Sequence, residues 1–209
     1  DGQTPLQLAV YNGHTEIVTI LLTQGADPNK ATTDVGSTPL YIAIYQEQLE
    51  IAQMLIEKGA DLNKATTDGI TPLIVAIIND RLDLIQMLLA RGADPNKATV
   101  QEQTPLFLSL EIGNIEIVKI LLANGADPNK STNLRRIGQT PLFASVEMGN
   151  IEIVKILLAN GADPNKMSIN ELYLPDEIAS TPLHLAINNS QVEIVKILLE
   201  ADADPNKQQ

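Results

Sequence analysis

The residues of this sequence that could take part in metal binding or acid–base chemistry are two histidines and a repeated aspartate. His14 and His184 are the only histidines, and the chain has no cysteine. The aspartate occurs in a motif, Ala-Asp-x-Asn-Lys, whose six copies begin at Ala26, Ala60, Ala93, Ala126, Ala162 and Ala203. A Lys follows each of these Asp residues three positions later, and Asp and Asn commonly bond to their own backbone in turns. We therefore interpret the motif as a repeated turn and predict no metal site.

Catalytic motifs of other kinds are not visible either. No Ser stands in a pattern with His and a carboxylate that would suggest nucleophilic catalysis, and no glycine-rich phosphate-binding loop occurs. The sequence therefore predicts a protein that is not an enzyme, with no catalytic residues and no cofactor.

The charge of the chain limits its partners. With 14 Lys and Arg against 26 Asp and Glu, the net charge is −12. Nucleic acids and anionic membranes attract basic surfaces, so we expect no nucleic-acid partner and no membrane partner. The sequence shows no signal peptide and no apolar stretch near the roughly 18 residues that a transmembrane helix needs. We expect an intracellular, cytoplasmic location or delivery into a host cytosol.

Internal repetition decides the fold class. The triplet Thr-Pro-Leu recurs in step with the aspartate motif and begins at Thr4, Thr38, Thr71, Thr104, Thr140 and Thr181. Residues 113–130 are identical to residues 149–166. In each unit, Thr is a good N-cap and Pro suits the first helical position. The apolar residues of a second helix, over residues 115–122 in the fourth unit, cover more than one stripe and must be buried on several sides. Stacked units would bury these faces, which predicts an all-α, α-rich solenoid.

The motifs resemble those of ankyrin repeats. Thr-Pro-Leu-His-Leu-Ala at residues 181–186, Asn-Gly-Ala-Asp at residues 124–127 and the period of about 33 residues carry the resemblance. It implies stacked helix-turn-helix pairs with short β-hairpin fingers, in which the first helices and the fingers line a concave face. We expect a single domain over residues 1–209, with repeats at about 1–33, 34–67, 68–100, 101–136, 137–177 and 178–209.

Several residues depart from the pattern of the family. The usual His after Thr-Pro-Leu is kept only at His184, and the matching positions hold Gln7, Tyr41, Ile74, Phe107 and Phe143. The glycine between the two helices is replaced by Glu47, Asp80 and Ser190. These departures leave the fold intact and call into question only the regular hydrogen-bond ladder that His supplies.

A partner-binding surface is expected where the repeats differ. One position near the end of the first helix holds Tyr11, Tyr45, Ile78, Glu111, Glu147 and Asn188 in successive repeats. If this position faces the concave groove, the groove changes from aromatic and apolar to acidic along the chain. Exposed Tyr is a favoured anchor at interfaces, and acidic residues steer basic partners. Simple solvation of these residues is the alternative. The position of Tyr41, Phe107 and Phe143 fits packing between repeats better than binding.

Two fingers are longer than the others, at residues 131–139 and 167–180. The first contains Arg135 and Arg136, and the second contains Leu172 and Tyr173 within an unusually apolar loop. Such loops often carry binding residues, although this one could equally fold back onto its neighbour. We include these four residues in the expected partner-binding surface.

The terminal repeats look like internal ones. Terminal repeats normally have a polar outer face, yet Ile17, Ile20 and Leu21 at one end and Ile194, Ile197 and Leu198 at the other are apolar. We expect these ends to be covered by further repeats, by a partner or by end-to-end self-association.

The leading interpretation is a non-catalytic scaffold that binds a protein or peptide partner with basic residues. The alternatives are a substrate-docking segment of a larger enzyme or effector, and a structural, self-associating array.

Overall fold

The computed structural model describes residues 2–132, 138–169 and 179–208. These residues form twelve α-helices, arranged in six pairs, and their β-structure consists of two isolated bridges. The prediction of an all-α repeat fold with very short hairpins is therefore confirmed. The chain divides into two compact units, Asp1–Val100 and Gln101–Gln209. The expectation of a single domain over the whole chain stays a prediction.

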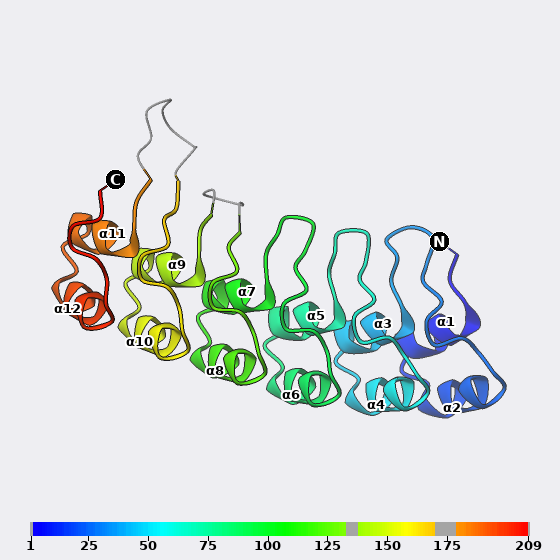
Figure 1. The fold of residues 1–209 in the computed structure, drawn as a ribbon. Helices are drawn as coiled ribbons and strands as arrows, with labels where there is room; N and C mark the ends of the chain where they lie inside the picture. Colours follow the sequence, from blue (N-terminus) through cyan, green and yellow to red (C-terminus); the bar gives the residue numbers. More distant parts are fainter. Residues whose placement is uncertain (1, 133–137, 170–178, 209) are drawn as a thin grey trace. The chain divides into compact units, whose positions relative to one another are not determined.

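Unit 1 contains three helix pairs. They are α1 (Pro5–Tyr11) with α2 (Thr15–Thr23), α3 (Pro39–Tyr45) with α4 (Leu49–Glu57), and α5 (Pro72–Ile78) with α6 (Leu82–Ala90). In Figure 1 the first helices α1, α3 and α5 form one layer of this unit and the second helices form another. Loops that project from the helices join each pair to the next.

Unit 2 repeats this arrangement. Its pairs are α7 (Pro105–Ile112) with α8 (Ile115–Ala123), α9 (Pro141–Glu147) with α10 (Ile151–Ala159), and α11 (Pro182–Asn188) with α12 (Val192–Glu200). The helix α9 packs between α7 and α11, and α10 packs between α8 and α12. Both units therefore consist of stacked copies of one helix pair.

The Thr of Thr-Pro-Leu is the N-cap of each first helix. In all six copies the Thr hydroxyl oxygen accepts a hydrogen bond from the third helical N–H, as from Tyr41 N to Thr38 Oγ1 at 3.1 Å. Pro occupies the first helical position, where its missing N–H is not needed. Helices of seven to nine residues are too short to be stable alone, so their stability comes from packing against neighbouring pairs. Accordingly, Leu40, Ile44, Leu73 and Ile77 are completely buried.

The turn between the two helices of a pair needs one residue whose backbone is in the left-handed region, with positive φ. Gly13 and Gly149 supply it with φ of 70° and 67°. Glu47, Asp80 and Ser190 adopt the same conformation, with φ of 57°, 53° and 56°, although their Cβ atoms disfavour it. The replacements noticed in the sequence therefore leave the turn geometry unchanged.

The Ala-Asp-x-Asn-Lys motif forms the predicted turn and also joins successive repeats. Asp27 Oδ1 accepts a hydrogen bond from Asn29 N at 2.8 Å, which closes the turn. Asn29 Oδ1 accepts from Asp61 N at 2.7 Å, and Lys64 Nζ donates to the Asn29 carbonyl at 2.8 Å. In unit 2, Asn129 makes the matching bonds with Asp163 and Lys166. Lys64, Lys97, Lys166 and Lys207 thus each reach the previous repeat instead of only balancing the Asp of their own motif.

The apolar residues expected at the two ends are only partly where the sequence placed them. On α2, Ile17 and Ile20 are exposed, as expected, and Leu21 is partly buried, but Ile194, Ile197 and Leu198 on α12 are buried. The expectation for α12 is wrong because these three residues lie on its buried side, in a helix that packs against both α10 and α11. Its opposite side carries the exposed Val192 and Leu199.

Candidate functional site

Three of the expected groove residues end the first helices of unit 1. Tyr11, Tyr45 and Ile78 are the last residues of α1, α3 and α5, and their exposed fractions are 55%, 59% and 55%. Asn79 Nδ2 donates a hydrogen bond to the Tyr45 carbonyl at 3.3 Å, which ties the end of α3 to the end of α5. Tyr45 is therefore presented to solvent from a backbone that is tied to the next repeat. Their role in binding stays a prediction.

The two acidic groove residues lie in unit 2. Glu111 belongs to α7 and Glu147 ends α9, and both are exposed. Gln103 Nε2 donates to Glu111 Oε2 at 3.2 Å, and Gln139 Nε2 donates to Glu147 Oε2 at 3.0 Å. Each Gln directly precedes the capping Thr of the same helix, so both carboxylates are held across a first helix in the same way. This repetition gives two fixed negative charges on unit 2.

The remaining predicted residues lie outside the described residues. These are Arg135, Arg136, Leu172 and Tyr173, in the two long fingers. The bases of both fingers are described, and each is closed by an antiparallel bridge. The bridges join Thr132 to Gln139 and Ser168 to Ser180.

Tyr41 is a further candidate residue, which the repeat pattern assigned to packing. Phe107 and Phe143 at the same repeat position are buried, as expected for packing between repeats, but Tyr41 is only partly buried. Its ring lies parallel to that of Tyr45, with an interplanar angle of 9° and 6.2 Å between the ring centroids. Burial raises the pKa of the Tyr41 phenol, and Tyr45 and Asp68 raise it further. The four-residue spacing of Tyr41 and Tyr45 on a helix was the signal that could have paired them.

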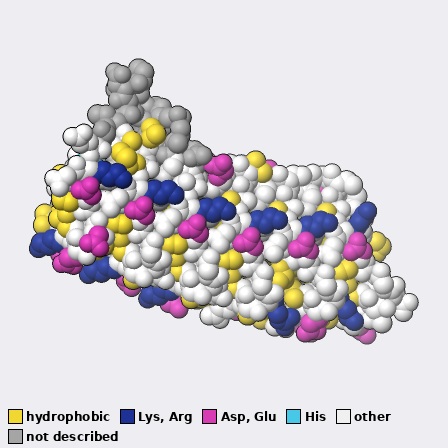
Figure 2. Space-filling model, in the orientation of Figure 1, with side chains coloured by type: hydrophobic (Ala, Val, Ile, Leu, Met, Phe, Trp, Pro, Cys, Tyr) yellow, Lys and Arg dark blue, Asp and Glu magenta, His cyan; other side chains and the backbone are white. Residues whose placement is uncertain are grey.

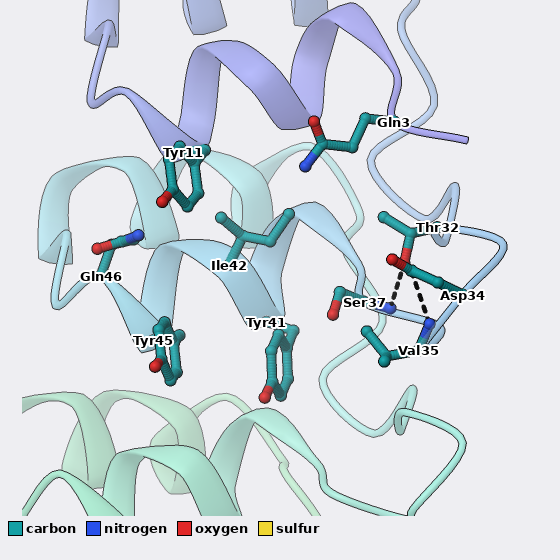
Figure 3. A pocket seen from close by; sticks show the side chains of 10 residues that line it. All are labelled: Gln3, Tyr11, Thr32, Asp34, Val35, Ser37, Tyr41, Ile42, Tyr45 and Gln46. Carbon is teal, nitrogen blue, oxygen red and sulfur yellow. Dashed lines mark hydrogen bonds between the residues drawn. The ribbon is translucent and has the colours of Figure 1, made fainter. Parts of the chain in front are cut away.

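The tyrosines of unit 1 converge on a cavity of about 330 Å³ between α1, α3 and the loop that joins α2 to α3. Figure 3 shows Tyr11 of α1 opposite Tyr41 and Tyr45 of α3, with the loop residues closing one side. The lining residues are Gln3, Tyr11, Thr32, Asp34, Val35, Ser37, Tyr41, Ile42, Tyr45 and Gln46. This volume is at the small end of the range for ligand sites, so the cavity suits a single large side chain.

Asp34 brings a fixed negative charge to this cavity. Val35 N donates to Asp34 Oδ1 at 2.6 Å, and Thr32 Oγ1 accepts from Ser37 N at 3.0 Å. The Thr32 side chain, followed by the Val35 N–H, holds the pKa of the Asp34 carboxyl below its usual value by hydrogen bonding to it. Asp34 is exposed and therefore stays ionised at neutral pH at the edge of the cavity.

The described part of the chain was also compared with the requirements of metal sites, histidine chemistry and membrane spans. Within it, no group of three or more His, Cys, Asp or Glu residues could hold a metal ion. His184 Nδ1 lies 2.7 Å from Thr181 Oγ1 and belongs to a capping box, which is a structural role. None of the described helices is long and apolar enough to cross a bilayer. Figure 2 shows Lys and Arg side chains next to Asp and Glu side chains on the face that it draws, so this face carries both signs of charge.

The end positions can be compared with their equivalents inside each unit. Ile187 of α11 has an exposed fraction of 58%, whereas Ile77 at the equivalent position of α5 is completely buried. On α2, Ile17 is exposed although its equivalent Ile51 on α4 is buried. The outer sides of α2, α11 and α12 therefore present the kind of apolar residue that a neighbouring repeat covers elsewhere.

Comparison with known proteins agrees with these features. A family model described as ankyrin repeats (three copies) matches residues 1–66, 30–99, 73–168 and 133–209. Together these matches span the chain. No curated protein matches it.

Proposed function

Because the chain belongs to the ankyrin-repeat family, we propose that it is a non-catalytic scaffold that binds a protein or peptide partner through its first-helix groove. Ankyrin repeats are generally protein–protein interaction modules and are typically non-catalytic. The groove is defined by Tyr11, Tyr45, Ile78, Glu111 and Glu147, with the long fingers, including Arg135, Arg136, Leu172 and Tyr173, as additional contacts.

The observation that carries the proposal is the exposure of Tyr11 and Tyr45 next to a cavity. Folding does not require a large aromatic side chain in these positions, since Glu111 and Glu147 fill them in unit 2 without changing the helix pair. Tyr brings much contact area at a small cost in side-chain entropy and is common among residues that dominate binding energy. A partner segment would insert one large side chain over unit 1.

Glu111 and Glu147 support a basic segment as the part of the partner that meets unit 2. Exposed charges mainly raise the association rate and its dependence on salt, and they add little affinity. The segment would be extended or helical. A cytosolic location, expected from the sequence, stays a prediction.

The test begins with a pull-down of the protein from a host lysate, followed by purification of the captured partner. We expect saturable 1:1 binding and protection of the ends of α1 and α3 in hydrogen exchange when the partner is added. Protection confined to the second helices would show that the partner uses another face, and the groove proposal would then be wrong.

End-to-end self-association is a second candidate, favoured by a different observation. Ile17 and Ile20 on α2 and Val192 and Leu199 on α12 are exposed apolar residues of the kind that pack between neighbouring repeats. A second copy could cover them by placing its α11–α12 pair against the α1–α2 pair of the first. Such a head-to-tail contact joins two different surfaces and would produce rings or open chains of molecules.

A docking segment within a larger enzyme or effector is the remaining alternative. Such a segment would use the same groove to hold a substrate. It would differ from the scaffold only in being part of an enzyme or effector.

A further inference from the structure

The cavity of unit 1 has a chemical character that the groove alone does not specify. Three tyrosine rings, from Tyr11, Tyr41 and Tyr45, line it together with Asp34. Among the described residues that line the cavity, Asp34 is the charged one. Aromatic faces attract cations through the negative charge above and below the ring, and a carboxylate does so directly. The cavity therefore favours a positively charged group with a flat or apolar body.

We propose that this cavity, which we call the tyrosine pocket, binds an arginine side chain of the partner. This inference rests on the proposed function, because it names the partner residue that unit 1 of the groove would recognise. The guanidinium group would lie against the faces of Tyr41 and Tyr45 and direct its N–H groups to the carboxylate of Asp34.

The geometry of the tyrosine pair suits a planar cation. The Tyr41 and Tyr45 rings are nearly parallel, at 9°, and are 6.2 Å apart between centroids. Figure 3 shows both rings side by side on the same face of α3, with Tyr11 across the cavity. Guanidinium is planar, weakly hydrated and stacks on aromatic faces, whereas the ammonium group of lysine is compact and strongly hydrated. Arginine is therefore preferred over lysine.

Asp34 is prepared to receive this group. The Val35 N–H donates a hydrogen bond to the carboxylate and orients it, and the Thr32 side chain helps to lower the pKa of the Asp34 carboxyl. A carboxylate can accept about four hydrogen bonds, so these two residues leave acceptor capacity for the two parallel N–H groups of a guanidinium. Asp68, which interacts electrostatically with Tyr41, adds a second negative charge near the pocket.

The size of the pocket sets the class of ligand. A volume of about 330 Å³ is too small for most cofactors and suits one long side chain. The apolar part of an arginine side chain would contact Ile42, which lies on the floor of the pocket between the tyrosines (Figure 3). The charged end would then reach Asp34 at the side formed by the loop.

The test uses the protein by itself and a small probe. N-acetyl-L-arginine N-methylamide is titrated into protein with labelled tyrosines, and the ring signals of Tyr41 and Tyr45 are followed by NMR. We expect saturable shifts at millimolar probe. The uncharged isostere N-acetyl-L-citrulline N-methylamide should bind at least about 10-fold more weakly, and the lysine analogue about 3-fold more weakly.

Variants separate the pocket from the general negative charge of the protein. Asp34→Asn keeps an oxygen that can accept from Val35 N but removes the charge, and should weaken arginine binding about 5-fold or more. Glu57→Gln removes an exposed charge at the end of α4, away from the pocket lining, and should leave binding unchanged. Circular dichroism checks that both variants remain folded.

The proposal is overturned by any of three results: shifts that do not saturate, equal binding of the citrulline probe, or equal effects of Asp34→Asn and Glu57→Gln. None of these results needs a partner, so each would leave the groove proposal standing. If the groove proposal fails instead, the partner will not contact the groove, although the arginine probe still binds the pocket.

Discussion

The side-chain amide of Gln7 donates a hydrogen bond to the backbone carbonyl of Ser37 at 2.9 Å and so ties α1 to the base of the loop that precedes α3. The same amide donates to the Lys30 carbonyl at 2.8 Å, and the Gln7 side-chain oxygen accepts from Thr4 N at 2.7 Å. Gln7 is completely buried. Gln7 departs from the His of the family, yet its side chain makes these three hydrogen bonds, and the one to Ser37 reaches the next repeat.

We expect Gln7→Ala to lower the free energy of unfolding by about 2 kcal/mol, because it leaves the buried Ser37 carbonyl without this donor. Urea denaturation measures the change. Gln7→His should retain much of the stability, since His184 occupies the equivalent position in α11, where its side chain accepts a hydrogen bond from the backbone of the N-cap Thr181. Gln24→Ala, at an exposed position after α2, is the control and should have little effect. Equal stability of Gln7→Ala and the parent protein would show that the linkage contributes nothing.

A glycine at position 190 should stabilise the protein. Ser190 has φ of 56°, a conformation that costs a residue with a Cβ roughly 1–2 kcal/mol. We expect Ser190→Gly to raise the free energy of unfolding by about 1 kcal/mol in thermal or urea unfolding. Glu47, in the same conformation, also pairs with Arg81 at 2.6 Å, so its replacement would mix two effects.

The reverse substitution is the matched control. Gly113 has φ of 79°, and an added Cβ would meet no atom within 4 Å. Gly113→Ser should therefore destabilise through the backbone alone and by a similar amount. A Ser190→Gly variant that is no more stable than the parent protein, or a Gly113→Ser variant that is no less stable, would contradict the role assigned to this turn.

Self-association through the ends can be measured by sedimentation equilibrium. If a second copy covers α2 and α12, the average mass should rise above the monomer value of 22.6 kDa as the concentration increases. Ile20→Lys, which places a charge among the exposed residues of α2, should restore the monomer. A constant mass of 22.6 kDa at the highest concentration would rule out this candidate.

The acidic groove residues Glu111 and Glu147 lead to a prediction about association kinetics. Replacing both Glu111 and Glu147 by Gln should slow association of a basic partner and weaken its dependence on salt, with little change in the dissociation rate. Stopped-flow measurements at low and high salt would show this. Glu116→Gln with Glu152→Gln, at the start of α8 and α10, is the matched control. If the control pair slows association as much, the effect belongs to net charge and not to the groove.

The fold was predictable because its signals are local and repeated. Thr-Pro-Leu caps every first helix, and the turn motif closes every repeat, so six copies support one interpretation. What the sequence did not reveal depends on which neighbour each residue meets. The buried Ile194 and the exposed Val192 lie on the same helix, and their types alone do not tell which side α10 covers.

The candidate site was predictable only in part. The shared repeat position identified Tyr11 and Tyr45, and both are exposed. Tyr41 was missed because Phe107 and Phe143 at its position are buried, so the repeat pattern favoured packing. Asp34 was missed because it lies in an ordinary loop, and only the folded chain brings that loop to the tyrosines.

The affinity of the purified partner for Tyr45→Ala tests the central claim, that the first-helix groove binds a protein, most directly. The comparison is with the parent protein and with Glu57→Ala on α4, and the free energy of unfolding is measured for each. We expect Tyr45→Ala to weaken binding by about 2 kcal/mol, or roughly 30-fold, while its stability stays within about 0.5 kcal/mol of the parent. Equal dissociation constants for Tyr45→Ala, Glu57→Ala and the parent protein would contradict the claim.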